Sequence, residues 1–386
     1  MAFERLLSVV VWAFALFAMF FGAGNIIYSL DIGQDYHWQS LVPTIGFILS
    51  GVCLPLIGIV GIFCAQGNVR HFFHAGLPPS LQKVLLMLIL FVWSPLGISP
   101  RAVVLSAASL EPWWGVIPIA LQHVLVVALI AYLSYDGSKL IKRIGGLLTP
   151  PLLITILVLT TMIFLQSSHE GLASVSSSVH DLHFSLFDGF VDGVKKGYFT
   201  LDGLSAVFFG RLLITSFQNE PHAKQRFFFS KVFILTGILL SLVYILLVYA
   251  SAKGTLIYDD PIPNKYILLK LSKDYLGSYA HILTAVLTVL ACLSTCVALS
   301  YIFSDYINRY LFNGQNKPLS FGINLGLTYI ISLLDIKGIE TIISPIGAVV
   351  YLMLLVLAVF QIVKHIKSKG WSWQIDEKSV ARSIDE

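Results

Sequence analysis

The sequence predicts an all-α, polytopic membrane protein with ten transmembrane helices, arranged as a five-plus-five inverted repeat whose first and sixth helices are broken. Composition is the first observation behind this prediction: 56% of the 386 residues are hydrophobic and 12% are charged, whereas a soluble domain carries about 25% charged residues. The second is a series of ten apolar segments of membrane-spanning length. The third is a polar, glycine-containing interruption in both the first and the sixth segment.

The ten segments follow one another along most of the chain. A helix that crosses the hydrocarbon core of a bilayer needs about 17 to 25 mostly apolar residues. The first segment is longer than the apolar run of a secretory signal, and nine further segments follow it, so we expect it to be a retained helix. The predicted segments are 6–28, 41–64, 84–110, 116–135, 147–166, 188–218, 227–251, 278–303, 319–334 and 341–363.

Lysine and arginine residues are concentrated in alternate loops between these segments. The loops 29–40, 111–115 and 167–187 contain neither residue, and most basic residues fall on the opposite side. The loop 252–277 is an exception, because it carries four lysines together with three aspartates. By the positive-inside rule, both termini are expected in the cytoplasm.

Ten segments with both ends on one side of the membrane can divide into two units of five. Because a unit of five crosses the membrane an odd number of times, its second copy must have the opposite orientation. This predicts a first repeat over 1–166, an outer loop over 167–187, a second repeat over 188–363 and a cytoplasmic tail over 364–386.

The interruption of the first segment is the sequence Gly-Ala-Gly-Asn at 22–25. Each glycine costs about 1 kcal/mol relative to alanine inside a helix, and freed backbone groups cost several more unless a polar partner meets them. The sixth segment carries Thr200, Asp202 and Gly203 at the corresponding place. Interruptions at matching positions of two halves indicate a central binding site.

Ionisable and hydroxyl side chains inside the apolar segments are candidates for function. Asp202 could carry a proton, balance a bound cation or form an ion pair with Arg101 of the third segment. Lys195 and Lys196, just before the sixth-segment break, are expected to lie toward the outer surface, where their ammonium groups can snorkel. Ser294 and Thr295 supply oxygens that suit a small alkali cation, or they bond back to their own helix.

Other classes of function lack support in the sequence. No Ser-His-Asp arrangement, metal-ligand cluster or phosphate-binding glycine loop is visible, so the chain is not expected to be an enzyme or to need a cofactor. The net charge of +4 is small. It falls mostly in loops, so no nucleic-acid partner is expected.

Five motifs follow one another along the chain. They are FALFAMFFGAGNIIY (14–28), GFILSGVCLPLIG (46–58), the Pro100-Arg101 pair, GYFTLDGLSAVFFG (197–210) and LACLSTCVAL (290–299). In this order they resemble the motifs of the branched-chain amino acid:cation symporter family, and the resemblance covers about 1–363. It implies a LeuT-like fold in a bacterial cytoplasmic (inner) membrane. It also implies import of leucine, isoleucine or valine coupled to Na⁺ or H⁺.

The resemblance also implies roles for individual residues. Backbone amides after the first break would bind the substrate carboxylate, and carbonyls near both breaks would bind its ammonium group. A Na⁺ ion would lie between the first and eighth segments. The implied substrate-binding residues are Phe20, Gly22, Ala23, Gly24, Asn25, Tyr198, Thr200, Leu201 and Asp202. The implied cation ligands are the carbonyls of Ala18, Phe21 and Ala291 and the hydroxyls of Ser294 and Thr295.

The sequence also departs from the family pattern. Residues 102–108 read Ala-Val-Val-Leu-Ser-Ala-Ala, where the family usually has polar residues and a glutamate, and Lys196 stands where the family has an acid. Relatives usually continue with two more spans. The first hypothesis is a Na⁺-driven importer of apolar amino acids. The alternatives are a proton-coupled permease for another amino acid and a membrane amino-acid receptor that does not transport.

Overall fold

The computed structural model describes residues 2–73, 78–137, 140–166, 185–216, 222–255, 258 and 260–369, and every regular element in these ranges is helical. Most of the predicted loop 167–187 and of the predicted tail 364–386 lies outside the described residues. The division into two repeats therefore stays a prediction.

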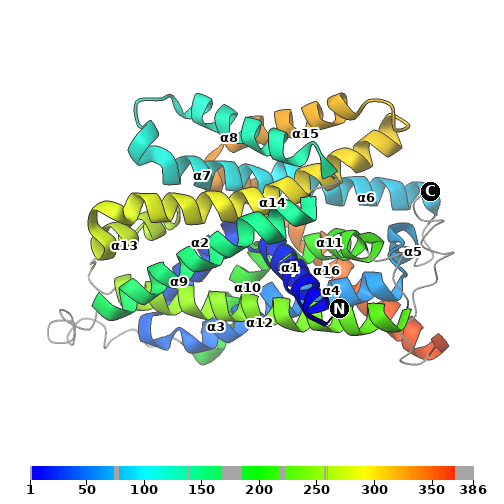
Figure 1. Cartoon of the computed structure of the whole chain (residues 1–386), viewed down its shortest axis with the longest axis horizontal. Coiled ribbons are helices and arrows are strands. Elements are labelled where there is room, and N and C mark those ends of the chain that lie inside the picture. Colours follow the sequence, from blue (N-terminus) through cyan, green and yellow to red (C-terminus); the bar gives the residue numbers. More distant parts are fainter. Residues whose placement is uncertain are drawn as a thin grey trace.

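The helices run mostly along the long axis of the molecule (Figure 1). In the first half they are α1 (Ala2–Phe20), α2 (Ala23–Tyr36), α3 (Leu41–Ile48), α4 (Leu54–Cys64), α5 (Val69–Phe73), α6 (Pro79–Trp93), α7 (Ser99–Trp114), α8 (Ile119–Ser134) and α9 (Thr149–Gln166). In the second half they are α10 (Leu186–Phe199), α11 (Asp202–Ser216), α12 (His222–Gly254), α13 (Ile267–Leu276), α14 (Ala280–Leu311), α15 (Lys317–Ser332) and α16 (Asp335–Lys369). Short π-helical turns at Leu49–Cys53, Ser94–Ile98 and Lys142–Leu148 join α3 to α4, join α6 to α7 and precede α9.

Two of the predicted segments are bent pairs of helices, as the sequence indicates. The axis turns by 71° between α1 and α2 and by 46° between α10 and α11. A third bent pair joins α15 to the start of α16 at 115°. Within the described residues, six further helical stretches are long and apolar enough to cross a membrane, and α8 is a shorter apolar helix. The exact count of ten spans remains a prediction.

Helix α2 continues past the predicted end of the first segment at residue 28, and the predicted loop 29–40 is helical as far as Tyr36. The extra turns carry Asp31 and Asp35, whose carboxylates lie 2.8 and 2.5 Å from the Lys196 ammonium group of α10. Asp192 adds a third carboxylate at 3.3 Å. This carboxylate cage neutralises the Lys196 ammonium group, which is 12% exposed, and the cage itself is open to the surface at Asp35, which is 43% exposed. The position of Lys195 and Lys196 toward the outer side of the membrane stays a prediction.

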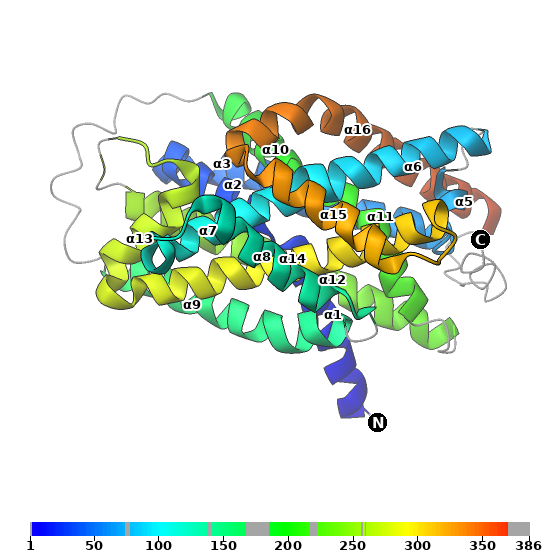
Figure 2. The same cartoon turned by 90° about the horizontal axis from the view of Figure 1, so that it is seen from above.

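The broken helices lie in the interior, between α14 on one side and α12 on the other (Figures 1 and 2). Helix α2 packs on α12, α10 on α3, α11 on α4, and α14 on α7. The α3–α10 crossing is close because glycines face it. A Cβ atom on Gly193 would lie 1.9 Å from the Pro43 carbonyl oxygen, and one on Gly46 would lie 2.3 Å from that of Phe190. Small residues permit this approach of two backbones, as is usual between membrane helices.

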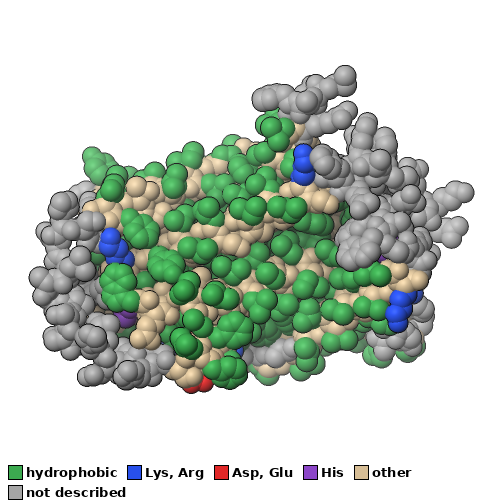
Figure 3. All heavy atoms as spheres, turned by 90° about the horizontal axis from the view of Figure 1, so that it is seen from below, with side chains coloured by type: hydrophobic (Ala, Val, Ile, Leu, Met, Phe, Trp, Pro, Cys, Tyr) green, Lys and Arg blue, Asp and Glu red, His purple; other side chains and the backbone are tan. Residues whose placement is uncertain are grey.

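The face of the molecule seen from below is mostly hydrophobic along its length, with lysine and arginine side chains near its two ends (Figure 3). On α12, for example, Ile234, Ile238 and Leu242 are 63%, 56% and 50% exposed. An apolar belt closed at both ends by cations matches the cross-section of a bilayer. The molecule is therefore built to be surrounded by lipid.

Gly193→Ala should lower the stability of the protein by about 1 to 3 kcal/mol, because the new methyl group overpacks the α3–α10 crossing. The matched control is Gly326→Ala on α15, where a Cβ atom would meet nothing within 4 Å. That control should be neutral or slightly stabilising, since alanine is the better helix former. Thermal melting of both purified variants measures the effect, and equal melting temperatures would contradict the packing described here.

Candidate functional site

The first break exposes the N-terminus of α2 to the protein interior. Helix α1 ends at Phe20, Gly22 has an extended backbone (φ −120°, ψ −160°), and α2 begins at Ala23. The amides in the first turn of a helix have no acceptor within that helix, and the helix dipole makes this end electropositive. Ala23 and Gly24 are buried. The break therefore presents positive, desolvated backbone groups at the centre of the molecule.

The second break lies directly beside the first. Helix α10 ends at Phe199, and α11 begins at Asp202. Between them Leu201 adopts φ +64°, a left-handed conformation that costs energy in a residue with a branched side chain. A Cβ atom on Gly24 would lie 3.2 Å from the Thr200 Cα atom. The backbone of one break thus touches the backbone of the other.

The side chain of Asn25 joins the two breaks. Its Oδ1 atom accepts a hydrogen bond from the Gly22 amide at 3.0 Å, so its Nδ2 atom faces the other way. Nδ2 donates to Asp202 Oδ2 at 2.6 Å and to Tyr244 Oη of α12 at 2.5 Å. Both protons of the amide group are used, and the residue is 2% exposed. Asn25 therefore connects α2, α11 and α12 at one buried point.

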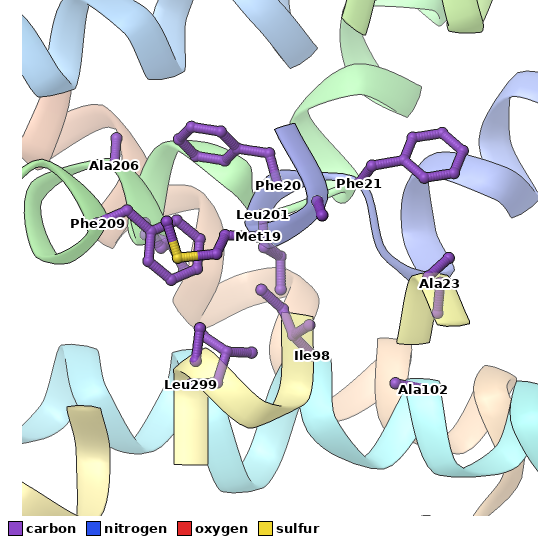
Figure 4. Close-up of a cluster of buried hydrophobic side chains, with 14 of the residues drawn as sticks. Met19, Phe20, Phe21, Ala23, Ile98, Ala102, Leu201, Ala206, Phe209 and Leu299 are labelled. Carbon is purple, nitrogen blue, oxygen red and sulfur yellow. The ribbon is translucent and has the colours of Figure 1, made fainter. Parts of the chain in front are cut away.

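Buried apolar side chains lie next to the breaks (Figure 4). Phe20 and Leu201 come from the breaks themselves. Ile98 ends the π-helical turn before α7, and Ala102 lies in the first turn of α7. All four are at most 5% exposed. The surroundings of the two breaks therefore combine polar backbone groups with an apolar wall.

Four of the five predicted cation ligands converge between α1 and α14. Ser294 Oγ lies 2.8 Å from the Ala18 carbonyl oxygen and 2.9 Å from that of Ala291. Thr295 Oγ1 lies 3.2 and 3.3 Å from the same two oxygens. The hydroxyls thus bond both to their own helix and to α1. The back-bonding drawn from the sequence is confirmed, and cation binding stays a prediction.

This oxygen cluster borders the first break, because a Cβ atom on Gly22 would lie 2.8 Å from Thr295 Oγ1. Phe21, the fifth predicted ligand, is fully buried at the break. Uncharged hydroxyl and carbonyl oxygens are hard donors suited to an alkali cation. In the described part of the chain, no group of three or more His, Cys, Asp or Glu side chains could hold a transition metal.

Arg101 does not pair with Asp202, contrary to one of the alternatives drawn from the sequence. Its Nη1 atom donates to the Phe199 carbonyl at 2.9 Å and to Tyr28 Oη at 3.4 Å. Tyr28 in turn donates to Glu340 of α16. The reason is geometric: Asp202 faces Asn25 at the start of α11, whereas Arg101 reaches the last carbonyl of α10.

Arg101, Tyr28 and Glu340 form a polar layer that links α7, α2 and α16. A small pocket beside this layer is also lined by Tyr198, Leu201 and Ile343. Sequence reasoning missed Tyr28, Glu340 and Tyr244 as site residues. Their signals in the sequence were weak, because the two tyrosines are compatible with simple packing and Glu340 stands in a predicted loop.

Comparison with known proteins gives consistent results. A profile of the family described as branched-chain amino acid transport protein matches residues 6–376. The chain is 28% identical over 392 residues to a putative branched-chain amino acid carrier protein of Staphylococcus aureus (strain USA300), covering 95% of this chain and 84% of the relative. It is 29% identical over 365 residues to one from Staphylococcus saprophyticus, covering 88% of this chain and 78% of that relative.

Two solved transporters have a similar fold. The crystal structure of MhsT in complex with L-phenylalanine aligns with a TM-score of 0.57 at 16% identity, covering 97% of this chain and 91% of that one. A mutant of the Eremococcus coleocola manganese transporter aligns with a TM-score of 0.55 at 14% identity, covering 98% and 91%. At these identities the likeness concerns the fold.

Asn25→Ala should destabilise the protein by about 2 to 4 kcal/mol, because it leaves the Gly22 amide and the Asp202 carboxyl group buried without their partner. Tyr244→Phe removes only one of the three bonds and should cost about 1 kcal/mol. Thermal melting of both purified variants gives the comparison. A melting temperature for Asn25→Ala at or above that of Tyr244→Phe would show that Asn25 does not hold the breaks together.

Proposed function

The chain belongs to the branched-chain amino acid transport protein family, and on that premise we propose that it imports leucine, isoleucine or valine in symport with Na⁺. In this proposal the substrate and the ion bind between the helix breaks, and the site opens alternately to the two sides of the membrane. Both termini lie in the cytoplasm of a bacterial cell, as the loop charges predict. The observation that carries the proposal is the convergence of the Ser294 and Thr295 hydroxyls on the Ala18 carbonyl beside the first break.

The backbone of the breaks supplies the groups that a zwitterion needs. The amides of Ala23 and Gly24, at the electropositive start of α2, would bind the carboxylate. The carbonyls of Phe20, Tyr198 and Leu201 would accept bonds from the ammonium group. The last two each accept a backbone bond at 3.0 Å. The Leu201 carbonyl also accepts a bond from the Ser205 hydroxyl at 3.4 Å, and the Tyr198 carbonyl accepts one from the Thr200 amide, so the ammonium group would replace the weaker bond on each oxygen. Gly22, Asn25, Thr200 and Asp202 would hold these groups in place.

The apolar wall supports an aliphatic substrate. Ile98, Ala102, Leu201 and Phe20 offer no hydrogen bond to a polar side chain, and burying such a side chain without a partner is costly. Alanine at 102, in a stretch where the family usually has polar residues, extends this apolar character. A branched aliphatic side chain would replace water with favourable contacts on this wall.

The proposed ion site explains how Na⁺ could drive uptake. The oxygens of Ser294 and Thr295 belong to α14, and that of Ala18 belongs to α1 just before the break. A cation held by these oxygens and by those of Ala291 and Phe21 would fix α1 against α14. Because the substrate amides lie a few residues later in α2, the bound ion would stabilise the geometry that binds the substrate.

The polar layer of Arg101, Tyr28 and Glu340 is suited to closing the site on the side where α2 ends. Within it, the hydrogen bond from Tyr28 to Glu340 joins α2 to α16, and the bond from Arg101 to Tyr28 joins α7 to α2. Bonds of this kind can be exchanged for bonds to water when the helices separate. We therefore assign this layer to the outer closure of the transport cycle.

Proton coupling is the second candidate, and one observation favours it. Asp202 is 3% exposed and, within the described residues, forms no ion pair. A buried carboxylate without a cation is costly, so such a group is often neutralised by a proton. In this alternative Asp202 would carry the proton that drives uptake.

Uptake of labelled leucine into proteoliposomes separates these possibilities. A Na⁺ gradient should drive accumulation, and a pH gradient in Na⁺-free buffer should not. Accumulation driven by the pH gradient alone would favour the Asp202 mechanism. Leucine binding without accumulation under either gradient would favour a receptor.

Thr295→Ala and Ser294→Ala should each weaken the apparent Na⁺ affinity of leucine uptake by about 10- to 150-fold, since each removes one charge-assisted contact of about 1.5 to 3 kcal/mol. Ser300→Ala is the control, because Ser300 lies on the same helix and its buried hydroxyl has no hydrogen-bond partner among the residues that the structure describes. The measurement is uptake rate against Na⁺ concentration. An unchanged Na⁺ dependence in both site variants would exclude this site.

Gly24→Ala should abolish leucine binding while the protein still folds. The added methyl group would contact Thr200 at 3.2 Å, where it would stand between the two breaks and displace the substrate. Gly322→Ala, at a position with open space around the Cβ atom, is the control. Melting temperature and leucine affinity are measured on the same preparation, and a less stable Gly24→Ala protein with normal affinity would assign Gly24 to packing alone.

A further inference from the structure

Helices α2 and α10 carry the groups proposed to hold the two ends of the substrate, yet each packs mainly on a different neighbour. Helix α2 packs on α12, and α10 packs on α3. At the breaks the two chains approach closely, since a Cβ atom on Gly24 would lie 3.2 Å from the Thr200 Cα atom. Farther from the breaks, where the two helices lie near each other (Figure 2), the carboxylate cage around Lys196 connects them.

The carboxylate cage joins α2 to α10 through one ammonium group. Asp31 and Asp35 stand one turn apart on α2, and Asp192 stands one turn before Lys196 on α10. Their carboxylate oxygens lie 2.8, 2.5 and 3.3 Å from Lys196 Nζ. Three acceptors match the three protons of an ammonium group. Tyr36, at the end of α2, also donates to Asp192 at 3.1 Å.

The cage attracts the two helices to each other only while its cation is present. Three carboxylates surround one ammonium group, so negative charge exceeds positive charge. Without the ammonium group, Asp31 and Asp35 of α2 would repel Asp192 of α10. The Asp31 and Lys196 side chains are 13% and 12% exposed, so water and salt screen this repulsion incompletely. The charge of Lys196 therefore turns a repulsion between the helices into an attraction.

The cage lies a short distance along each helix from the groups of the candidate site. Lys196 is in the last turn of α10, two residues before Tyr198, whose carbonyl is proposed to accept a bond from the substrate. Asp31 lies about two turns after Gly24 on α2. A helix is stiff over so short a distance, because backbone hydrogen bonds join its successive turns. A cage that fixes α2 against α10 therefore also fixes the α2 amides against the α10 carbonyls.

We propose that Lys196 is a positioning residue for the substrate, which sets the distance between the α2 amides and the α10 carbonyls by holding the two helices together. This inference rests on the proposed function, because that function assigns these groups to the two ends of an amino acid. The substrate must bond to both groups at once, so a small displacement of one helix would break one set of bonds. Lys196 acts through the two helices and not by its own contact with the substrate.

Leucine affinity of the purified full-length protein tests the proposal. Lys196→Met keeps the apolar stem of the side chain but removes the charge, and it should weaken leucine binding about 10-fold. Lys196→Arg should keep the affinity within about twofold, because a guanidinium group also bonds several carboxylate oxygens. Lys195→Met is the matched control, since Lys195 is the adjacent residue, is exposed and lies outside the cage. The control should bind leucine normally.

A cation added from solution should replace the missing ammonium group. Carboxylate oxygens from two helices are suitable ligands for Ca²⁺. Ca²⁺ should therefore restore the leucine affinity of Lys196→Met and leave that of the unaltered protein unchanged. Lost packing around the lysine stem would not respond to Ca²⁺, so this measurement separates the charge from a structural role. A Lys196→Met protein that folds only in the presence of Ca²⁺ would equally support the proposal.

Hydrogen–deuterium exchange without leucine tests the connection between the helices independently of the proposed function. The amides of α2 and α10 should exchange faster in Lys196→Met than in the unaltered protein, and Ca²⁺ should slow the exchange again. Unchanged exchange would overturn the proposal even if the unaltered protein bound no leucine, a result that would itself contradict the proposed function.

Three results of the leucine measurement would also overturn the proposal. One is an affinity of Lys196→Met equal to that of the unaltered protein. Another is an equal loss of affinity in Lys195→Met, which would mean that any positive charge on this turn has the same effect. The third is a folded Lys196→Arg protein that has lost the affinity, because the charge at this position would then be insufficient.

Discussion

The side-chain amide of Asn25 is the interaction on which the centre of this structure depends. Two interrupted helices in a membrane interior leave backbone groups that no water can reach, and each costs several kcal/mol when it stays unpaired. Asn25 binds the Gly22 amide of its own break, the Asp202 carboxyl group of the other break and the Tyr244 hydroxyl group of α12. With these three groups satisfied, the breaks can keep other backbone groups available for a ligand.

The same arrangement explains why the proposed ion and substrate sites are adjacent. The oxygen cluster of Ala18, Ala291, Ser294 and Thr295 borders Gly22, and the amides of Ala23 and Gly24 follow Gly22 directly in the chain. Leu201 holds the second break in a left-handed conformation. Strain of this kind persists only where surrounding contacts impose it. The two breaks therefore form one unit, in which a change of geometry at the proposed ion site would shift the amides proposed to bind the substrate.

The parts of this account that the sequence could predict are local. Two glycines and an asparagine inside an apolar segment predict a break without any knowledge of neighbours, and the adjacent hydroxyls at 294 and 295 predict a cluster of oxygens. The sequence could not predict the contacts between distant parts of the chain. The partners of Arg101 come from α2 and α10, and the carboxylates around Lys196 come largely from turns of α2 that polarity alone suggests are a loop. In both cases hydrogen bonds or ion pairs with distant residues stabilise a charged side chain in the interior, where hydropathy alone would not place it.

The central claim is that the ion and the substrate share the geometry of the first break. Leucine affinity of the purified protein, measured over a series of Na⁺ concentrations with K⁺ as the balancing ion, tests it most directly. The account predicts that Na⁺ strengthens leucine binding and that leucine strengthens Na⁺ binding by the same factor, because coupling between two sites is reciprocal. A leucine affinity that does not change between Na⁺ and K⁺ would contradict it.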